Sequence, residues 1–182
     1  MRAKILLSIL ILGLIGILSG CNMQTVDKLY CIPRRSEAFH ELQLAIDTMQ
    51  DKIKDLEYDV VVGPESRGFI FGTPIAYNNK KPFVLIRKQG KLPRETVSIS
   101  YELEYGSATI EMHKDSIQPG QKVLIVDDLI ATGGTTKAMI ELIESLGGEV
   151  AGVVVMIELA GLNGREVLKG YRLESAICYE GK

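Results

Sequence analysis

The sequence predicts an α/β protein with a doubly wound, mainly parallel sheet. Short apolar runs rich in β-branched residues alternate with amphipathic segments of helical length, which is the pattern of strands covered on both faces and joined by crossover helices. A polar segment rich in β-formers interrupts this order once, as a hairpin would. The 182 residues, 46% of them hydrophobic, suffice for one core, so we expect a single domain over residues 36–182.

Each expected strand is a short apolar run, and each expected helix is a longer segment with apolar residues at helical spacing. The clearest strand is 123–126 (VLIV), which is continuously apolar and has three β-branched residues among its four. The clearest helix is 137–146 (KAMIELIESL), which ends at Gly147-Gly148. The expected order is helix 37–56, strand 59–62, helix 69–77, strand 83–86, hairpin 95–113, strand 123–126, helix 137–146, strand 150–157 and strand 173–177.

The most informative segment is 123–136 (VLIVDDLIATGGTT), in which two carboxylates and a glycine turn follow an apolar run. We expect the strand to stop at Asp127-Asp128, and the small residues 131–135 to lead into the helix. Free amides at a helix N-terminus, together with the helix dipole, attract an anion, and ligands of open α/β sheets bind outside the carboxyl ends of the strands. The segment therefore predicts a sugar-phosphate site. An isolated acid pair or glycine pair would indicate only a strand end or a tight turn.

This segment resembles the phosphoribosyl-pyrophosphate (PRPP) motif of type I phosphoribosyltransferases. Resemblance to the adenine-specific members covers residues 60–169 nearly throughout, and it rests on VVVGPESRGFIFG (60–72), VLIRKQGKLPRET (84–96), YELEYG (101–106), EMHKDSIQPGQKV (111–123) and LNGREVLKGY (162–171). It implies the type I phosphoribosyltransferase fold with a β-hairpin flap. It also implies purine salvage, in which phosphoribosyl passes from PRPP to adenine to give AMP and pyrophosphate, with Mg²⁺ as cofactor.

The predicted PRPP site combines the acid pair with the glycine loop. Its residues are Asp127, Asp128, Ala131, Thr132, Gly133, Gly134 and Thr135. The loop is expected to hold the 5-phosphate, and the two acids the ribose hydroxyls. The acids are also expected to be catalytic and to act on Mg²⁺ indirectly, because this cation keeps waters and binds largely through substrate oxygens. A β-branched residue at Gly134 should abolish PRPP binding, by filling the phosphate site or by excluding a required backbone angle.

A second group of residues, 65–68 (ESRG), follows the expected strand 59–62 and should lie at the same edge of the sheet as Asp127. The planar guanidinium of Arg67 suits phosphate oxygens, and Gly68 permits close backbone approach. By resemblance, Ser66 and Arg67 bind pyrophosphate through a cis peptide bond. An ordinary surface ion pair is the alternative role for Arg67.

Four cations lie within 87–94 (RKQGKLPR), directly after the expected strand 83–86. In a chain with a net charge of −2 this concentration favours pyrophosphate binding, although charge runs are more often solvated surface. By resemblance, Arg87, Lys88 and Lys91 act across the interface of a homodimer and reach the active site of the neighbouring copy.

The segment 101–106 (YELEYG) is too polar for a core and is expected to form a flap that keeps water from a developing oxocarbenium ion. By resemblance, Glu104 is directed towards the base and Tyr105 lies near the reacting centre, so both are expected to be catalytic. Composition alone would allow Glu104 to be an ordinary surface acid. Leu159 is a weaker candidate for contact with the base.

Composition argues against other classes of function. A net charge of −2 and a pI near 5.8 disfavour a nucleic-acid-binding surface. The two histidines, His40 and His113, show no zinc spacing, and a hydrogen-bonding role at a strand end is favoured for His113. The three cysteines lack a disulfide framework, and Cys31 and Cys178 are candidates for buried thiols.

Residues 1–21 resemble a bacterial lipoprotein signal. Basic residues precede an apolar run over 5–18, which is shorter than the roughly 20 residues of a spanning helix, and Cys21 would be lipidated. Residues 22–35 read as a linker in place of the hood that adenine enzymes carry over the base, so we expect a reduced or missing hood.

These features of the N-terminus leave alternatives for location and function. We expect a cytoplasmic enzyme, since PRPP is made there, with an exported lipoprotein anchored through Cys21 as the alternative. A hood-impaired, membrane-tethered nucleotide-binding derivative and a PRPP-sensing regulator are the alternative functions.

Overall fold

The computed structural model describes residues 35–103 and 106–180. The chain falls into two compact units, 1–45 and 46–182, and the described part of the first unit is the beginning of helix α3 (Arg35–Lys52). Within the described ranges, no helix is both long and apolar enough to cross a membrane.

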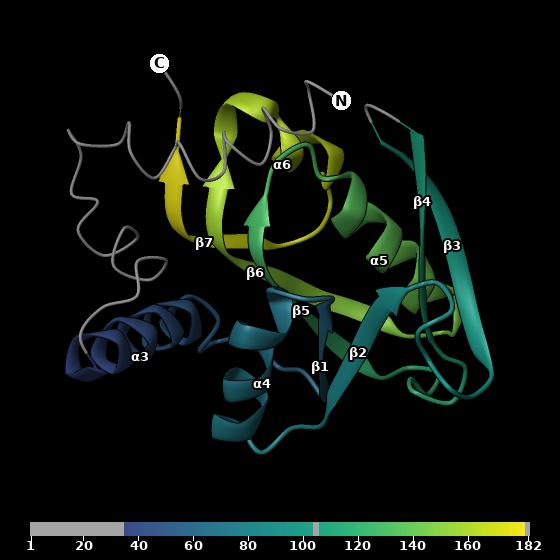
Figure 1. Cartoon of the computed structure of the whole chain (residues 1–182), viewed down its shortest axis with the longest axis horizontal. Coiled ribbons are helices and arrows are strands. Elements are labelled where there is room, and N and C mark those ends of the chain that lie inside the picture. Colours follow the sequence, from purple (N-terminus) through teal and green to yellow (C-terminus); the bar gives the residue numbers. More distant parts are fainter. Residues whose placement is uncertain (1–34, 104–105, 181–182) are drawn as a thin grey trace. The chain divides into compact units, whose positions relative to one another are not determined.

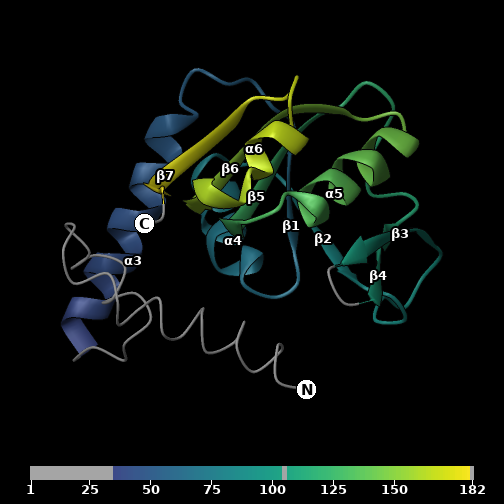
Figure 2. The ribbon, with the colours of Figure 1, turned by 90° about the horizontal axis from the view of Figure 1, so that it is seen from above.

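A seven-stranded sheet is the centre of the second unit, with the strand order β3-β4-β2-β1-β5-β6-β7 (Figure 1). The neighbours β2, β1, β5, β6 and β7 pair in parallel, whereas β3 and β4 form an antiparallel hairpin that joins the sheet through β2. The hairpin and β7 stand at opposite ends of the sheet (Figure 2). The strands are β1 (Val60–Pro64), β2 (Phe83–Lys88), β3 (Thr96–Leu103), β4 (Gly106–His113), β5 (Lys122–Ile130), β6 (Glu149–Leu159) and β7 (Leu173–Tyr179).

Helices cover both faces of the central strands, as the sequence predicted for a doubly wound sheet. The further helices are α4 (Gly68–Asn78), α5 (Gly134–Ser145), the 3-10 turn η1 (Ala160–Leu162) and α6 (Gly164–Val167). Successive residues of a strand point to opposite faces. Val60, Val62 and Ile125 therefore share a core cluster with the apolar residues of α5, while Val61 and Leu124 are buried on the other face, where α4 contacts β1 and β5.

The elements differ from the prediction mainly at their ends. Helix α3 ends at Lys52, four residues early, α5 begins three residues early, and β6 and β7 extend two residues further. The short elements η1 and α6 were missed, because three or four residues are too few to show a helical period.

The topology brings two loops together. Because β1 and β5 are parallel neighbours, their carboxyl ends lie at the same edge of the sheet, and the segments 65–68 and 131–134 emerge side by side.

Candidate active site

The loops after β1 and β5 enclose a cavity of about 360 Å³, lined by residues 64–67, Tyr101 and 127–136. The structure therefore gathers Ser66, Arg67, the two acids and the whole predicted phosphate loop around one space. Their roles in binding and catalysis stay predictions.

The two acids, Asp127 and Asp128, lie inside strand β5. The strand runs on to Ile130, and Asp127 pairs with Val155 of β6. The prediction that the strand stops at the acids is wrong, because the backbone ladder to β6 continues where the apolar side chains end. Both acids are nearly buried, at 8% and 6% exposed, so the sheet fixes their backbone positions.

The acids are electrostatically linked. The amide of Asp128 donates to Oδ1 of Asp127 at 2.7 Å. Burial, and then the neighbouring Asp128 carboxylate, raise the pKa of Asp127 well above its usual range. Burial and the neighbouring carboxylate thus oppose ionisation of Asp127, whereas a cation or a hydroxyl donor at the pair would favour it.

The predicted phosphate loop turns the chain sharply from β5 into α5. Gly133 has a φ of 82°, and a β-carbon there would lie 2.8 Å from the carbonyl oxygen of Gly164. Helix α5 begins at Gly134, and its N-cap residue, Gly133, has no side chain that could cap the helix. The first amides of the helix are therefore left to bind an anion.

The backbone-angle reason for the expectation at Gly134 is wrong, whereas obstruction of the phosphate site by a side chain there stays a prediction. Gly134 lies in the helix, and a β-carbon there would meet only the carbonyl oxygen of Glu102, at 4.0 Å. The required backbone angle belongs to Gly133, because only that residue of the pair has a positive φ.

Arg67 connects the two loops. The peptide bond between Glu65 and Ser66 is cis, in the segment for which the family resemblance implied one. Nε of Arg67 donates to Oδ2 of Asp128, and the Arg67 side chain is 45% exposed. Arg67 thus forms an ion pair, as the alternative proposed, but its partner is an acid of the site.

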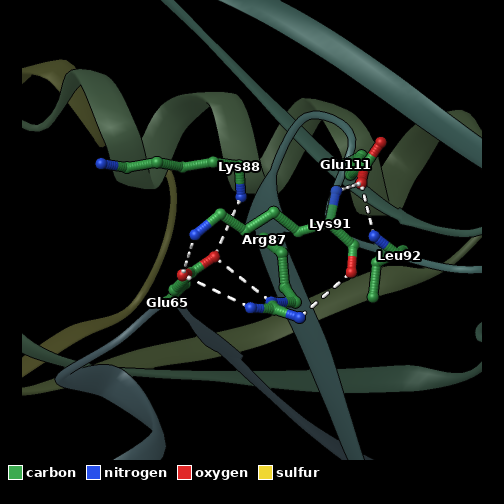
Figure 3. A network of polar contacts seen from close by, with 6 residues as sticks. All are labelled: Glu65, Arg87, Lys88, Lys91, Leu92 and Glu111. Carbon is green, nitrogen blue, oxygen red and sulfur yellow. Dashed lines mark hydrogen bonds and ion pairs between the residues drawn. The ribbon is translucent and has the colours of Figure 1, made fainter.

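The basic segment 87–94 begins within β2, which runs two residues beyond the expected strand, and it contacts the site through Glu65. Nε of Arg87 and Nζ of Lys91 donate to the Glu65 carboxylate at 3.2 and 3.1 Å, and the amide of Lys88 does so at 3.4 Å (Figure 3). The side chain of Lys88 points away from Glu65 (Figure 3). None of the three cations lines the cavity, but Glu65 does.

Glu111 of β4 holds the backbone of the same segment, a role the sequence analysis missed. Its Oε1 accepts the amides of Lys91 and Leu92 at 2.9 and 3.0 Å, and its Oε2 accepts the hydroxyl of Thr96 at 3.3 Å. Burial opposes ionisation, but the loop amides outweigh it and lower the pKa of Glu111. The alternation of Ile110, Glu111 and Met112 is typical of a strand with its acid on the exposed face, so no local pattern indicated this role.

Lys91, and then Arg87, lower the pKa of Glu65 to about 2 from an ordinary value of 4.5. Because the folded-state pKa of Glu65 is depressed, the stabilisation of the folded state by these contacts is complete above pH 4.5. It is lost as the pH falls towards 2.

We expect Lys91→Met to raise the pKa of Glu65, measured by carbon NMR of the Glu65 carboxyl from pH 7 to below the pKa of about 2. Lys169→Met, at an exposed lysine, is the control. An unchanged Glu65 titration in Lys91→Met would refute the contact.

The hairpin β3–β4 confirms the predicted β-structure of the flap, with pairing from Thr96↔His113 to Leu103↔Gly106. Oγ1 of Thr135 donates to the hydroxyl of Tyr101 at 3.2 Å, which links the flap to the phosphate loop. Tyr101 was missed, although it follows the partly buried Val97 and Ile99 at a spacing of two. The predicted catalytic residues Glu104 and Tyr105 lie outside the described residues.

The site offers oxygen ligands for Mg²⁺ but no closed metal cage. Among the described residues, no three His, Cys, Asp or Glu side chains gather as a metal site. Two adjacent carboxylates fit this cation, which commonly takes one or two protein carboxylates with waters and substrate oxygens. The donor set of Asp127 and Asp128 is therefore suited to Mg²⁺.

Three other candidates lie away from the cavity. Leu159 is the last residue of β6 and does not line it. Nδ1 of His113 is buried without a hydrogen-bond partner in the described part of the chain, so the hydrogen-bonding role is wrong for this nitrogen. Cys178 is exposed, so the prediction of a buried thiol is wrong there, because the end of β7 is uncovered on one side; Cys31 lies outside the described residues.

Comparison with known proteins agrees with this geometry. Residues 35–179 match the family model of the phosphoribosyl transferase domain. The chain belongs to the phosphoribosyltransferase family. Adenine phosphoribosyltransferase of Lachnoclostridium phytofermentans is 64% identical over 141 residues, which cover 78% of this chain and 81% of that protein.

Solved structures of the family show the same fold. The crystal structure of adenine phosphoribosyltransferase from Thermoanaerobacter pseudethanolicus superposes with a TM-score of 0.76 at 45% identity, covering 78% of this chain and 82% of that one. The Saccharomyces cerevisiae enzyme, solved with an imino-altritol bisphosphate and adenine, has a TM-score of 0.69 at 38% identity, covering 78% and 80%. Within the family, the chain falls among the adenine phosphoribosyltransferases.

Proposed function

We propose that this chain transfers the phosphoribosyl group of PRPP to adenine and forms AMP and pyrophosphate in purine salvage. The observation that carries the proposal is the single cavity in which a buried acid pair adjoins an uncharged helix N-terminus. The first feature suits ribose hydroxyls, and the second suits a phosphate monoester. Its relatives in the family act on adenine.

In the proposed complex, the amides and hydroxyls of 131–135 bind the 5-phosphate, and Asp127 and Asp128 accept hydrogen bonds from the ribose hydroxyls. Hydroxyl donors at the pair favour the ionised form of Asp127, whose pKa is otherwise raised. Asp127 and Asp128 would hold Mg²⁺ largely through substrate oxygens, and the cation would supply positive charge that stabilises the departing pyrophosphate.

A cation at the same edge of the sheet is proposed to neutralise the negative charge of the leaving pyrophosphate. Arg67 is half exposed on the cavity, so its guanidinium can bind pyrophosphate oxygens beside Asp128. Glu104 and Tyr105 of the flap are proposed to act at the base and at the reacting centre, and Leu159 to contact the base.

The function is tested by measuring the pyrophosphate that the purified full chain forms from PRPP. The rates with adenine, hypoxanthine, guanine, uracil and orotate are compared. We expect turnover with adenine alone. Turnover with another base instead would overturn the specificity while leaving the phosphoribosyl transfer intact, and no turnover with any base would overturn the function.

We also propose a homodimer in which Arg87, Lys88 and Lys91 act on the neighbouring copy. The Lys88 side chain is exposed and points away from Glu65 (Figure 3), which supports this role. Arg87 and Lys91 would have to leave Glu65. Mixing inactive Lys88→Met copies with inactive Asp128→Asn copies should restore activity, because mixed dimers contain one intact site. Absence of restoration after subunit exchange would refute action in trans.

A cytoplasmic location is likewise our proposal, since the substrate PRPP is made in the cytoplasm. We expect the full chain to fractionate with soluble protein and to take up no labelled fatty acid. Uptake of label and membrane sedimentation, both abolished by Cys21→Ser, would establish the lipoprotein instead.

A further inference from the structure

The phosphate loop rests on a backbone contact with a segment 31 positions further along the chain. A β-carbon on Gly164 would lie 2.3 Å from the carbonyl oxygen of Ala131 and 3.1 Å from the amide nitrogen of Gly133. A β-carbon on Gly133 would lie 2.8 Å from the carbonyl oxygen of Gly164. The two backbones thus meet without an intervening side chain, so a shift of the segment around Gly164 must move the loop.

The supporting segment is too small to fix its own position. It consists of the one-turn elements η1 and α6, separated by Asn163 at a φ of 57°. Gly161, Leu162 and Asn163 are exposed, as are Arg165 to Val167, and only Gly164 and Leu168 are buried. Helices this short contribute little stability alone, so the position of the segment depends on contacts with the sheet.

Leu168 supplies the apolar part of those contacts, as a member of the core cluster, and Arg165 supplies the polar part. Its Nε and Nη2 donate to the two carboxylate oxygens of Glu158 at 2.9 and 2.6 Å, and its Nη1 donates to the carbonyl oxygen of Leu173 at 2.8 Å. Ser175 donates its hydroxyl to the same carboxylate at 2.9 Å. Glu158 is 4% exposed, and a two-pronged contact of this kind fixes direction as well as distance.

Glu158 stands at the base of the phosphate loop. It pairs in register with Ile130, the last residue of β5 before the loop. The Cγ1 atom of Ile130 would also lie 3.0 Å from a β-carbon on Gly164. The ion pair, the start of the loop and the Gly164 contact therefore form one continuous packed unit.

We propose that the ion pair between Glu158 and Arg165 positions the phosphate loop, through Gly164, for the 5-phosphate of its ligand. Arg165 does not line the cavity, so it is a positioning residue and not a catalytic one. The inference rests on the proposed function, because it takes the loop as the 5-phosphate site. It extends that function by assigning the segment 160–168 a role in binding.

The 5-phosphate does not react, so its contacts stabilise the bound substrate and the transition state equally. Loss of such contacts raises KM with little change in kcat. We expect Arg165→Met to raise the KM for PRPP about tenfold and to leave kcat nearly unchanged. Binding of ribose 5-phosphate and of AMP, measured by calorimetry, should weaken by a similar factor, whereas binding of pyrophosphate should not change.

Arg172→Met is the matched control. Arg172 makes a comparable set of contacts, with Nη1 and Nη2 each 2.8 Å from a carboxylate oxygen of Asp55 and with Nη2 3.0 Å from the carbonyl oxygen of Lys52. It is one residue before β7, and its hydrogen bonds within the described residues go to Asp55, Lys52 and Glu174 and not to the phosphate loop. We expect both variants to lower the melting temperature, and only Arg165→Met to weaken the binding of ribose 5-phosphate.

A second variant tests the partner. Glu158→Gln should raise the KM for PRPP as Arg165→Met does, and the double variant should be no worse than either single one, because both remove the same unit. Should Arg165→Met fail to fold, Arg165→Lys takes its place, since it keeps the charge and removes the two-pronged contact.

Equal affinities for ribose 5-phosphate in the Arg165 and Arg172 variants, with an active unsubstituted enzyme, would overturn the positioning role alone. Absence of PRPP binding by the unsubstituted chain would overturn the proposed function and the inference with it.

Discussion

Asp128→Asn is expected to lower kcat for AMP formation by about two orders of magnitude or more, which is the usual scale for a lost transition-state contact. A neutral amide cannot hold the ribose hydroxyls and the charge of Mg²⁺ as a carboxylate does. The substitution also removes the negative charge that pairs with Arg67, whose Nε donates to the Asp128 carboxylate. Initial rates at saturating PRPP and adenine measure the effect, and circular dichroism checks that the fold is kept.

Asp115→Asn is the control for this substitution. Asp115 is an exposed acid that also pairs with an arginine, at 2.7 Å from Nη1 of Arg94. Its variant should keep the full rate. A rate near that of the unsubstituted enzyme in Asp128→Asn would remove the acid pair from the mechanism.

Gly133→Ala is expected to lower kcat/KM for PRPP by about 100-fold, the scale of a misplacement near 1 Å. The added methyl group would lie 2.8 Å from the carbonyl oxygen of Gly164, at a φ of 82° that alanine rarely adopts. The loop must therefore move, and its amides move with it. Calorimetric titration with PRPP gives the loss of affinity directly.

Gly120→Ala separates the backbone cost from the displacement of the loop. Gly120 has nearly the same φ, 80°, but a β-carbon there meets no atom within 4 Å. Both variants should lose stability, and only Gly133→Ala should lose PRPP affinity. If the two lost affinity alike, or neither did, the loop contact with Gly164 would not control binding.

The sequence predicted the parts of the site whose residues lie close together in one continuous segment. The segment 123–136 contains the acids, the turn and the helix start in one stretch, and the parallel sheet follows from repeated apolar runs. Its misjudged feature was the end of β5, because backbone pairing with β6 depends on a partner strand and not on the apolar character of β5 itself.

The parts that were missed depend on contacts between distant segments. Glu111 meets the amides of 91–92, Glu65 meets Arg87 and Lys91, and Gly164 meets the loop after β5. No periodicity or motif predicts such a contact, because neither residue stands out from the pattern of its own segment. Tyr101 could be predicted only in part. The alternation in β3 gives the direction of its side chain, but not its hydrogen-bond partner, Thr135.

The position of the acids within the ladder of β5 and β6 ties the chemistry to global unfolding. Asp127 and its neighbours are held by the same hydrogen bonds that hold the core, and central strands open only with the whole domain. Partial opening at the sheet edges would leave the carboxylates in place. Hydrogen exchange at the β5 amides that bond to β6 beyond Val126 should therefore be as slow as in the most protected core. Loss of the acid geometry on heating should coincide with the cooperative transition.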